Sequence, residues 1–95
     1  MTKETVYEPS EEIINNAVIS NEEFEELYKE SINNPDQFWD REARNYLSWD
    51  KEWDVVKESD LAKGDINWFK GAKLNASVNC VDRHLENNGE KTAII

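Results

Sequence analysis

The apolar residues between positions 21 and 33 repeat with the spacing of one helix face. Four of them stand at the i, i+3, i+4 and i+8 positions, with mainly acidic residues between them: Phe24, Leu27, Tyr28 and Ile32. Ser20 precedes Glu23 by three residues, which is the spacing of a capping box at a helix N-terminus. The pattern therefore predicts an amphipathic helix over residues 21–33.

A second amphipathic helix is expected to follow directly. Asn34 is a favourable N-cap residue, and Pro35 suits the first helical position because its missing N–H would have no acceptor there. One face then carries apolar residues up to about position 47: Trp39, Ala43, Tyr46 and Leu47. Two such helices hold more aromatic surface than they can bury against each other, so we expect a third packing surface.

The segments on either side of these helices have weaker patterns. Residues 1–10 show no sustained period and are interrupted by Pro9, so we predict a mobile arm over residues 1–19 that contains at most a short helix at residues 11–18. Residues 48–70 are rich in aromatic side chains but lack a 3.6-residue period. We expect a loop there with two short extended pieces, residues 55–57 and 66–69, pairing across a turn near Gly64.

A helical period returns between residues 73 and 88. The apolar positions recur at intervals of four, three and four: Leu74, Val78, Val81 and Leu85. Polar residues recur opposite them: Asn75, Asn79, Asp82 and Glu86. We predict one helix with Asn75 as N-cap, a buried apolar seam, and a left-handed stop at Asn88 and Gly89.

The last residues, 91–95, have the pattern of the beginning of an apolar strand. A strand needs a neighbour, and no later segment of the sequence supplies one. We therefore expect the chain to be the front piece of something larger. Up to that strand, the predicted fold class is mainly α, with two or three amphipathic helices and an aromatic-rich loop region.

Charge divides the chain into an acidic front and a neutral back. Residues 1–60 hold 17 acidic and 6 basic residues, whereas residues 61–95 hold 4 acidic and 5 basic residues, and the whole chain of 95 residues has a net charge of −10. Such an excess disfavours nucleic acids and anionic membranes as partners. The chain shows no signal peptide and no membrane-length apolar run, so we expect one small, soluble, cytoplasmic domain.

Few residues are candidates for chemistry. A single cysteine and a single histidine exclude an internal disulfide and a structural zinc site, and three isolated glycines exclude a phosphate-binding loop. Cys80 and His84 are one helical turn apart, but no third residue is spaced to orient the histidine. We interpret them as a partly buried thiol and an interfacial histidine.

Two further groups have structural interpretations. We expect Arg83 to pair with a carboxylate of another element. The carboxylates of the loop lie around two tryptophans, an arrangement that suggests either a sugar or cation site or, as we favour, a solvated loop with two buried indoles: Trp49, Asp50, Glu52, Trp53 and Asp54. We therefore assign no catalytic, cofactor-binding or metal-binding residue.

Residues 68–85 read W-F-K-G-A-K-L-N-A-S-V-N-C-V-D-R-H-L. This segment resembles the W-F-x-G-G-x-L-N-x-S-x-N-C-x-D-R-H segment of AMP-forming acetyl-CoA synthetases, with Ala72 in place of a second glycine and Val78 where tyrosine is frequent. Residues 35–39 resemble the D-P-x-x-F-W motif of that family. Residues 91–95 are similar to the first strand of its large α/β domain.

The resemblance implies an activity for the parent enzyme: ATP and acetate give acetyl-adenylate and pyrophosphate, and coenzyme A then takes the acetyl group. It also implies that the phosphate loop, the ribose-binding aspartate and the catalytic lysine lie beyond Ile95. ATP, Mg²⁺ and coenzyme A are thus cofactors of the parent enzyme and not of this chain, for which no catalytic residue carries over.

The residue pattern and the resemblance together divide the chain into a mobile arm (1–19), a helical N-terminal region (20–89) and the start of the first strand of the absent large domain (90–95). The expected partner is the remainder of the synthetase, and exposed apolar surface also predicts self-association. We expect this N-terminal region to be inactive alone. The alternative from a different class is a free-standing acidic helical module that binds another protein.

Overall fold

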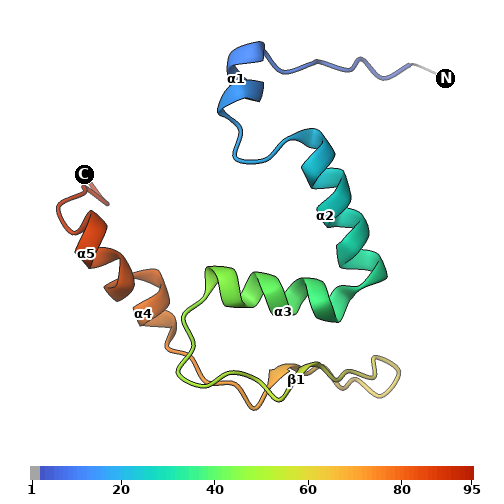
Figure 1. The fold of residues 1–95 in the computed structure, drawn as a ribbon, viewed down its shortest axis with the longest axis vertical. Helices are drawn as coiled ribbons and strands as arrows, with labels where there is room; N and C mark the ends of the chain where they lie inside the picture. Colours follow the sequence, from blue (N-terminus) through green and yellow to red (C-terminus); the bar gives the residue numbers. More distant parts are fainter. Residues whose placement is uncertain (1–2) are drawn as a thin grey trace.

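Helices and one hairpin follow each other along an open arc in the computed structural model, which describes residues 3–95 (Figure 1). The helices are α1 (Glu11–Asn16), α2 (Asn21–Asn33), α3 (Pro35–Tyr46), α4 (Ala76–Cys80), the 3-10 turn η1 (Asp82–His84) and α5 (Leu85–Asn88). The strands are β1 (Val55–Lys57) and β2 (Trp68–Lys70). The predicted mainly-α class is confirmed.

Helix α2 begins and ends where the sequence pattern places it. The Ser20 hydroxyl accepts a hydrogen bond from the Glu23 N–H at 3.1 Å, and the Glu23 carboxylate accepts one from the Ser20 N–H at 2.7 Å. Both bonds of the predicted capping box are therefore present, and they satisfy two backbone donors that the first helical turn leaves free. The short helix α1 is also confirmed and ends at Asn16.

The junction of α2 with α3 differs from the prediction in one respect. Pro35 opens α3 as expected, but the Asn34 side chain makes no capping hydrogen bond. Asn34 also ends α2, since its N–H donates to the Glu30 carbonyl at 2.7 Å. Its backbone, at φ −134° and ψ 61°, serves this double role and lies outside the extended conformation of an ordinary N-cap.

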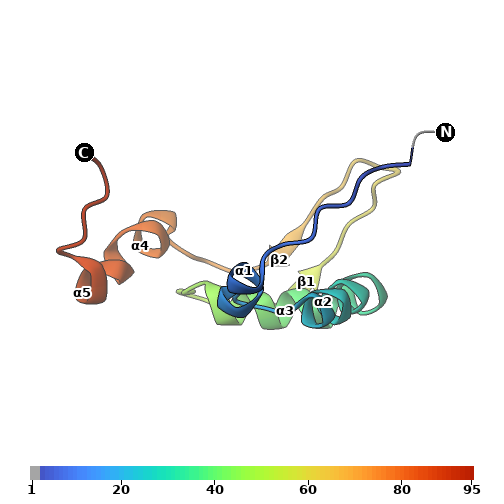
Figure 2. The same ribbon diagram turned by 90° about the horizontal axis from the view of Figure 1, so that it is seen from above.

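The predicted pairing of the two extended pieces is confirmed. Strands β1 and β2 are antiparallel, with Val55 opposite Lys70 and Lys57 opposite Trp68, so β2 begins two residues later than expected. Isolated bridges continue the pairing on both sides, and Gly64 takes a φ of 76° in the turn at the tip. The hairpin projects out of the plane of α2 and α3 (Figure 2).

The continuous helix predicted over residues 73–88 is wrong. Asn75 caps α4 as expected, but the backbone of Val81 leaves the helical region at φ −127° and ψ −66°. The Asn79 carbonyl is bound by the Arg83 and His84 side chains at 2.9 Å each. These contacts occupy the acceptor that a continuing helix would offer to the backbone N–H of residue 83.

The end of the chain also departs from the sequence pattern. Gly89 is right-handed, at φ −57° and ψ −35°, so the predicted left-handed stop is wrong. Residues 91–95 form no strand with the other described residues. Their place as the first strand of a larger domain stays a prediction, as does the mobility of the N-terminal arm, whose first two residues lie outside the described part of the chain.

The arc is far more open than a compact domain of its size. Its radius of gyration is 18.8 Å, against about 12 Å for a compact chain of this length. Only Ala43, Trp53 and Asn79 are buried among residues 3–95. The predicted surplus of aromatic surface is thus confirmed. None of the described helices has the length and apolar character needed to cross a membrane.

Candidate functional site

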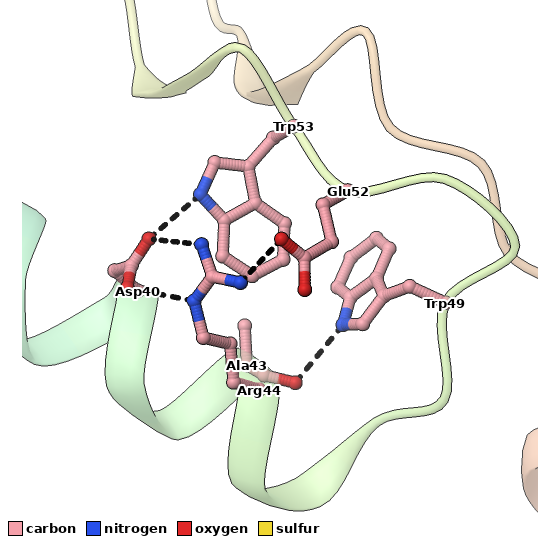
Figure 3. Close-up of polar contacts among 6 residues, drawn as sticks. All are labelled: Asp40, Ala43, Arg44, Trp49, Glu52 and Trp53. Carbon is pink, nitrogen blue, oxygen red and sulfur yellow. Dashed lines mark hydrogen bonds and ion pairs between the residues drawn. The ribbon is translucent and has the colours of Figure 1, made fainter.

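One cluster joins α3 to the loop that follows it (Figure 3). The Trp53 indole N–H donates to the Asp40 carboxylate at 2.9 Å, and the Trp49 indole N–H donates to the Ala43 carbonyl at 3.0 Å. Three rings then pack together, with centroids 4.9–5.4 Å apart: Trp49, Trp53 and Phe69. We call these three residues the aromatic cluster; it ties β2 to α3.

Arg44 completes the polar side of this cluster. Its guanidinium donates to Asp40 at 3.0 and 3.2 Å, pairs with Glu52 at 2.5 Å, and lies 4.6 Å from the centre of the Trp53 ring. A cation above an indole face is held by the quadrupole of the ring, so Arg44 contributes to packing as well as to charge pairing. The Arg44 pKa is raised, chiefly by the hydrogen bond to Asp40.

The favoured interpretation of the aromatic loop is largely confirmed. Trp53 is buried and Trp49 is half-buried, while Asp50 and Asp54 are exposed. Because Glu52 pairs with Arg44, these carboxylates do not converge on one point. Within residues 3–95 no three His, Cys, Asp or Glu side chains are grouped as metal ligands would be. The arrangement is that of a structural loop around two indoles; the absence of a sugar or cation site stays a prediction.

The pKa of Asp40 is held below its ordinary value of 3.8, first by the hydrogen bond from Arg44 and also by the one from Trp53. Since the folded-state pKa is depressed, the stabilisation is present above the ordinary pKa and is lost as the pH falls through the lowered one. We therefore expect the NMR signal of the Trp53 indole N–H to titrate with a midpoint below pH 3.8.

Asp40→Asn is the control for this titration, because the amide keeps an acceptor oxygen but does not ionise. The Trp53 signal should then lose its acid titration. A midpoint at or above pH 3.8 in the unsubstituted chain would contradict the proposed coupling.

A second cluster holds the C-terminal helices against the end of α3. The Asn79 side chain accepts from the Ser48 N–H at 2.8 Å and donates to the Ser48 and Asn75 carbonyls at 2.9 Å each. Asn79 is 6% exposed and is the most buried polar residue of the described chain. Periodicity places Asn79 on the polar stripe opposite the predicted buried seam, yet the structure buries this residue, because its amide binds backbone groups of two separate segments.

Arg83 supports the same contact in an unexpected way. It donates to the Tyr46 carbonyl at 2.8 Å, to the Asn79 carbonyl at 2.9 Å and to the Ser48 hydroxyl at 3.4 Å. The predicted carboxylate partner is therefore wrong. Carbonyls at a helix C-terminus lack intrahelical donors and carry partial negative charge, so a cation is well placed there. We call Asn79, Arg83 and Ser48 the polar joint.

Cys80 and His84 share no hydrogen bond in the described part of the chain. His84 Nε2 instead lies 2.9 Å from the Asn79 carbonyl oxygen and 3.4 Å from Arg83 Nε. Their non-catalytic interpretation stays a prediction. Cys80 is exposed, so its expected partial burial is wrong. The family pattern, in which an asparagine occupies position 79, could have indicated the polar joint. Periodicity alone placed Asn79 on the polar face of a helix.

Comparison with known proteins identifies the family. A family model described as "Acetyl-coenzyme A synthetase N-terminus" matches residues 24–80, which is more than half of the chain. The chain belongs to this family. The resemblance seen in residues 68–85 is thereby confirmed, and the matched residues extend from α2 through the hairpin to the end of α4.

Individual relatives carry the same name. The chain is 47% identical to acetyl-coenzyme A synthetase of Magnetococcus marinus over 95 residues, all of this chain and 15% of that protein. It is 46% identical to acetyl-coenzyme A synthetase 2 of Pseudomonas aeruginosa over 79 residues, 83% of this chain and 12% of that protein. The Dictyostelium discoideum enzyme is 46% identical over 78 residues, 82% of this chain and 12% of the relative. The chain spans only about a seventh of these proteins.

Three groups lie among the many exposed apolar side chains of this acetyl-coenzyme A synthetase N-terminus. On α2, Phe24 and Tyr28 stack at 6.2 Å and are 52% and 55% exposed. Trp39 and Trp68 meet edge to face at 6.2 Å, each 42% exposed. The third group is the apolar stripe of the C-terminal helices, which the sequence predicts to be buried and of which the structure leaves Leu74, Val81 and Leu85 exposed.

Proposed function

We propose that this chain is the N-terminal structural region of an acetyl-coenzyme A synthetase. The parent enzyme would activate acetate with ATP to acetyl-adenylate and then transfer the acetyl group to coenzyme A. The observation that carries the proposal is the 47% identity over all 95 residues to an enzyme of that name, of which this chain covers 15%. A free-standing protein-binding module is not favoured, because the relatives named above are all much longer synthetases.

The residues of this chain do not suit ATP, Mg²⁺ or coenzyme A. Gly64, Gly71 and Gly89 are isolated in the sequence, so no glycine-rich loop cradles a phosphate. The described part of the chain also groups no three candidate metal ligands. We therefore assign these ligands to the rest of the parent enzyme and propose no catalytic residue in this chain.

The proposal includes the partner, the boundaries and the location of the chain. The partner is the remainder of the synthetase, with residues 1–19 as an arm, 20–89 as the packed region and 90–95 as the first strand of the large domain. An exposed free thiol at Cys80 suits a reducing cytoplasm. Self-association is not supported, because two copies with net charges of −10 repel each other.

The test is acetate-dependent exchange of labelled pyrophosphate into ATP. We expect exchange by the polypeptide in which this chain is joined to the remainder of the synthetase, and none by the 95-residue chain alone. Omitting acetate is the control for exchange driven by contaminating enzymes. Exchange that follows the purified short chain, or its absence from the long polypeptide, would refute the proposal.

A further inference from the structure

The C-terminal helices dock on their own chain through polar groups and leave their apolar stripe outside. The side chain that is buried is Asn79, at 6% exposure, and its contacts are backbone groups of Ser48 and Asn75. The apolar residues are much more open: Leu74 is 39%, Val81 54% and Leu85 58% exposed. An amphipathic helix ordinarily buries its apolar stripe. Here the polar Asn79 is buried instead, and Leu74, Val81 and Leu85 are exposed.

Helices α4 and α5 also stand at one end of the arc, apart from α1 and α2 (Figure 1). The segment reaches the rest of the chain mainly through the polar joint, where Arg83 binds the end of α3 and Asn79 binds Ser48. Hydrogen bonds of this kind set an orientation but bury little apolar area. The stripe is therefore held in a defined direction, with Val78 half-buried and Leu74, Val81 and Leu85 left exposed by residues 3–95.

The solvent-accessible surface area of the chain indicates how large a partner would be needed to cover the exposed surface. The accessible surface is 8755 Å², whereas a compact protein of 11.1 kDa exposes about 5,700 Å². The excess of about 3,000 Å² is several times the roughly 800 Å² that each partner buries in a standard interface. A small transient partner would leave most of this surface in water.

Charge and chain length select between a second copy and a larger partner. Two copies would bring net charges of −10 against each other, which opposes a dimer. In the relatives the matching segment is 12–15% of a much longer polypeptide, so the rest of that polypeptide is a large partner joined to the segment by the chain itself. Residues 61–95 are nearly neutral, with 4 acidic and 5 basic residues, so an apolar contact at this end needs no basic surface opposite.

We propose that the C-terminal stripe, formed by Leu74, Val78, Val81 and Leu85, is the surface on which the large domain of the same synthetase polypeptide docks. The polar joint holds α4 and α5 at the angle that this contact requires. The inference rests on the proposed function, since it takes the large domain to be part of the same chain. Beyond the proposed function, the inference specifies which face of α4 and α5 contacts the large domain and which residues orient these helices.

Thiol labelling in the joined polypeptide tests the stripe directly. In a Cys80→Ser background, Leu85→Cys and Glu86→Cys place thiols at neighbouring positions, both exposed in the structure of residues 3–95. We expect maleimide to label the Leu85→Cys peptide at least about tenfold more slowly than the Glu86→Cys peptide, as quantified by mass spectrometry. Equal rates in the folded polypeptide would overturn the inference; equal rates in urea are the control for intrinsic reactivity.

A second measurement covers the case in which a thiol variant fails to fold. Val81→Asp in the same polypeptide should speed hydrogen exchange across residues 76–88, because a carboxylate on the stripe resists burial against the large domain. Glu86→Gln is the matched control and should leave that exchange unchanged. If Val81→Asp exchanges like the unsubstituted polypeptide, the stripe is not buried and the inference fails.

Pyrophosphate exchange on the same samples separates the two proposals. A joined polypeptide without acetate-dependent exchange but with a protected Leu85→Cys thiol would refute the enzymatic assignment and leave the docking surface standing. Normal exchange with an unprotected thiol would refute the docking surface alone.

Discussion

Asn79→Asp is expected to detach helices α4 and α5 from the end of α3. The Asn79 amide donates to the Ser48 and Asn75 carbonyls at 2.9 Å, and a carboxylate would point an oxygen at both of them. A buried charge facing two acceptors costs several kcal/mol, or forces the group to take up a proton. The measurement is hydrogen exchange at the Ser48 N–H, which donates to Asn79 at 2.8 Å and should lose its protection.

Two comparison variants make this result specific to the amide. Asn79→Ala removes the bonds without adding a charge and should cost about 1–3 kcal/mol, the range for leaving buried polar groups unpaired. Asp82→Asn changes an exposed residue three positions along the chain and should leave Ser48 protected. If Asn79→Asp and Asp82→Asn gave the same exchange rate at Ser48, the polar joint would not hold the two segments together.

Trp53→Ala is expected to be the most damaging apolar substitution in the part of the chain before helix α4. Trp53 is 9% exposed, its ring meets Trp49 at 5.0 Å and Phe69 at 4.9 Å, and Arg44 lies over its face at 4.6 Å. Removing a buried aromatic side chain typically costs about 3–5 kcal/mol. The loss should appear as a lower urea midpoint, followed by far-ultraviolet circular dichroism, since few other buried contacts join the hairpin to α3.

The matched variant is Trp53→Phe, which keeps a ring in the aromatic cluster but removes the N–H that binds Asp40 at 2.9 Å. We expect it to cost about 1–2 kcal/mol, because Asp40 retains its contacts with Arg44. A Trp53→Ala midpoint no lower than that of Trp53→Phe would show that the aromatic cluster contributes little to stability.

Much of the local structure followed from short-range chemistry in the sequence. Helix α2 begins at Asn21 because Ser20 and Glu23 complete a capping box within four residues, and Pro35 opens α3 because its ring suits the first helical turn. The antiparallel pairing of residues 55–57 with β2 was also predictable, although the onset of β2 was not. The family was predictable too, because residues 68–85 carry a long and specific motif.

The candidate interaction site depended on contacts that periodicity does not encode. Arg83 reaches the Tyr46 carbonyl 37 positions away, and Asn79 binds Ser48 across 31 positions. Those two contacts turn a residue of the polar stripe inward, while the Arg83 and His84 side chains occupy the Asn79 carbonyl beside the break at Val81.

The sequence by itself thus determined where helices α2 and α3 start and end, and which family the chain belongs to, because capping groups, proline and the motif act within a few residues of one another. Only the tertiary structure decided which face of the C-terminal helices is buried. A helical period of 3.6 residues shows that two faces differ in polarity, but burial depends on what each face meets. Here the neighbouring backbone offers carbonyls and an N–H, so the amide of Asn79 packs inward while Val81 and Leu85 stay exposed.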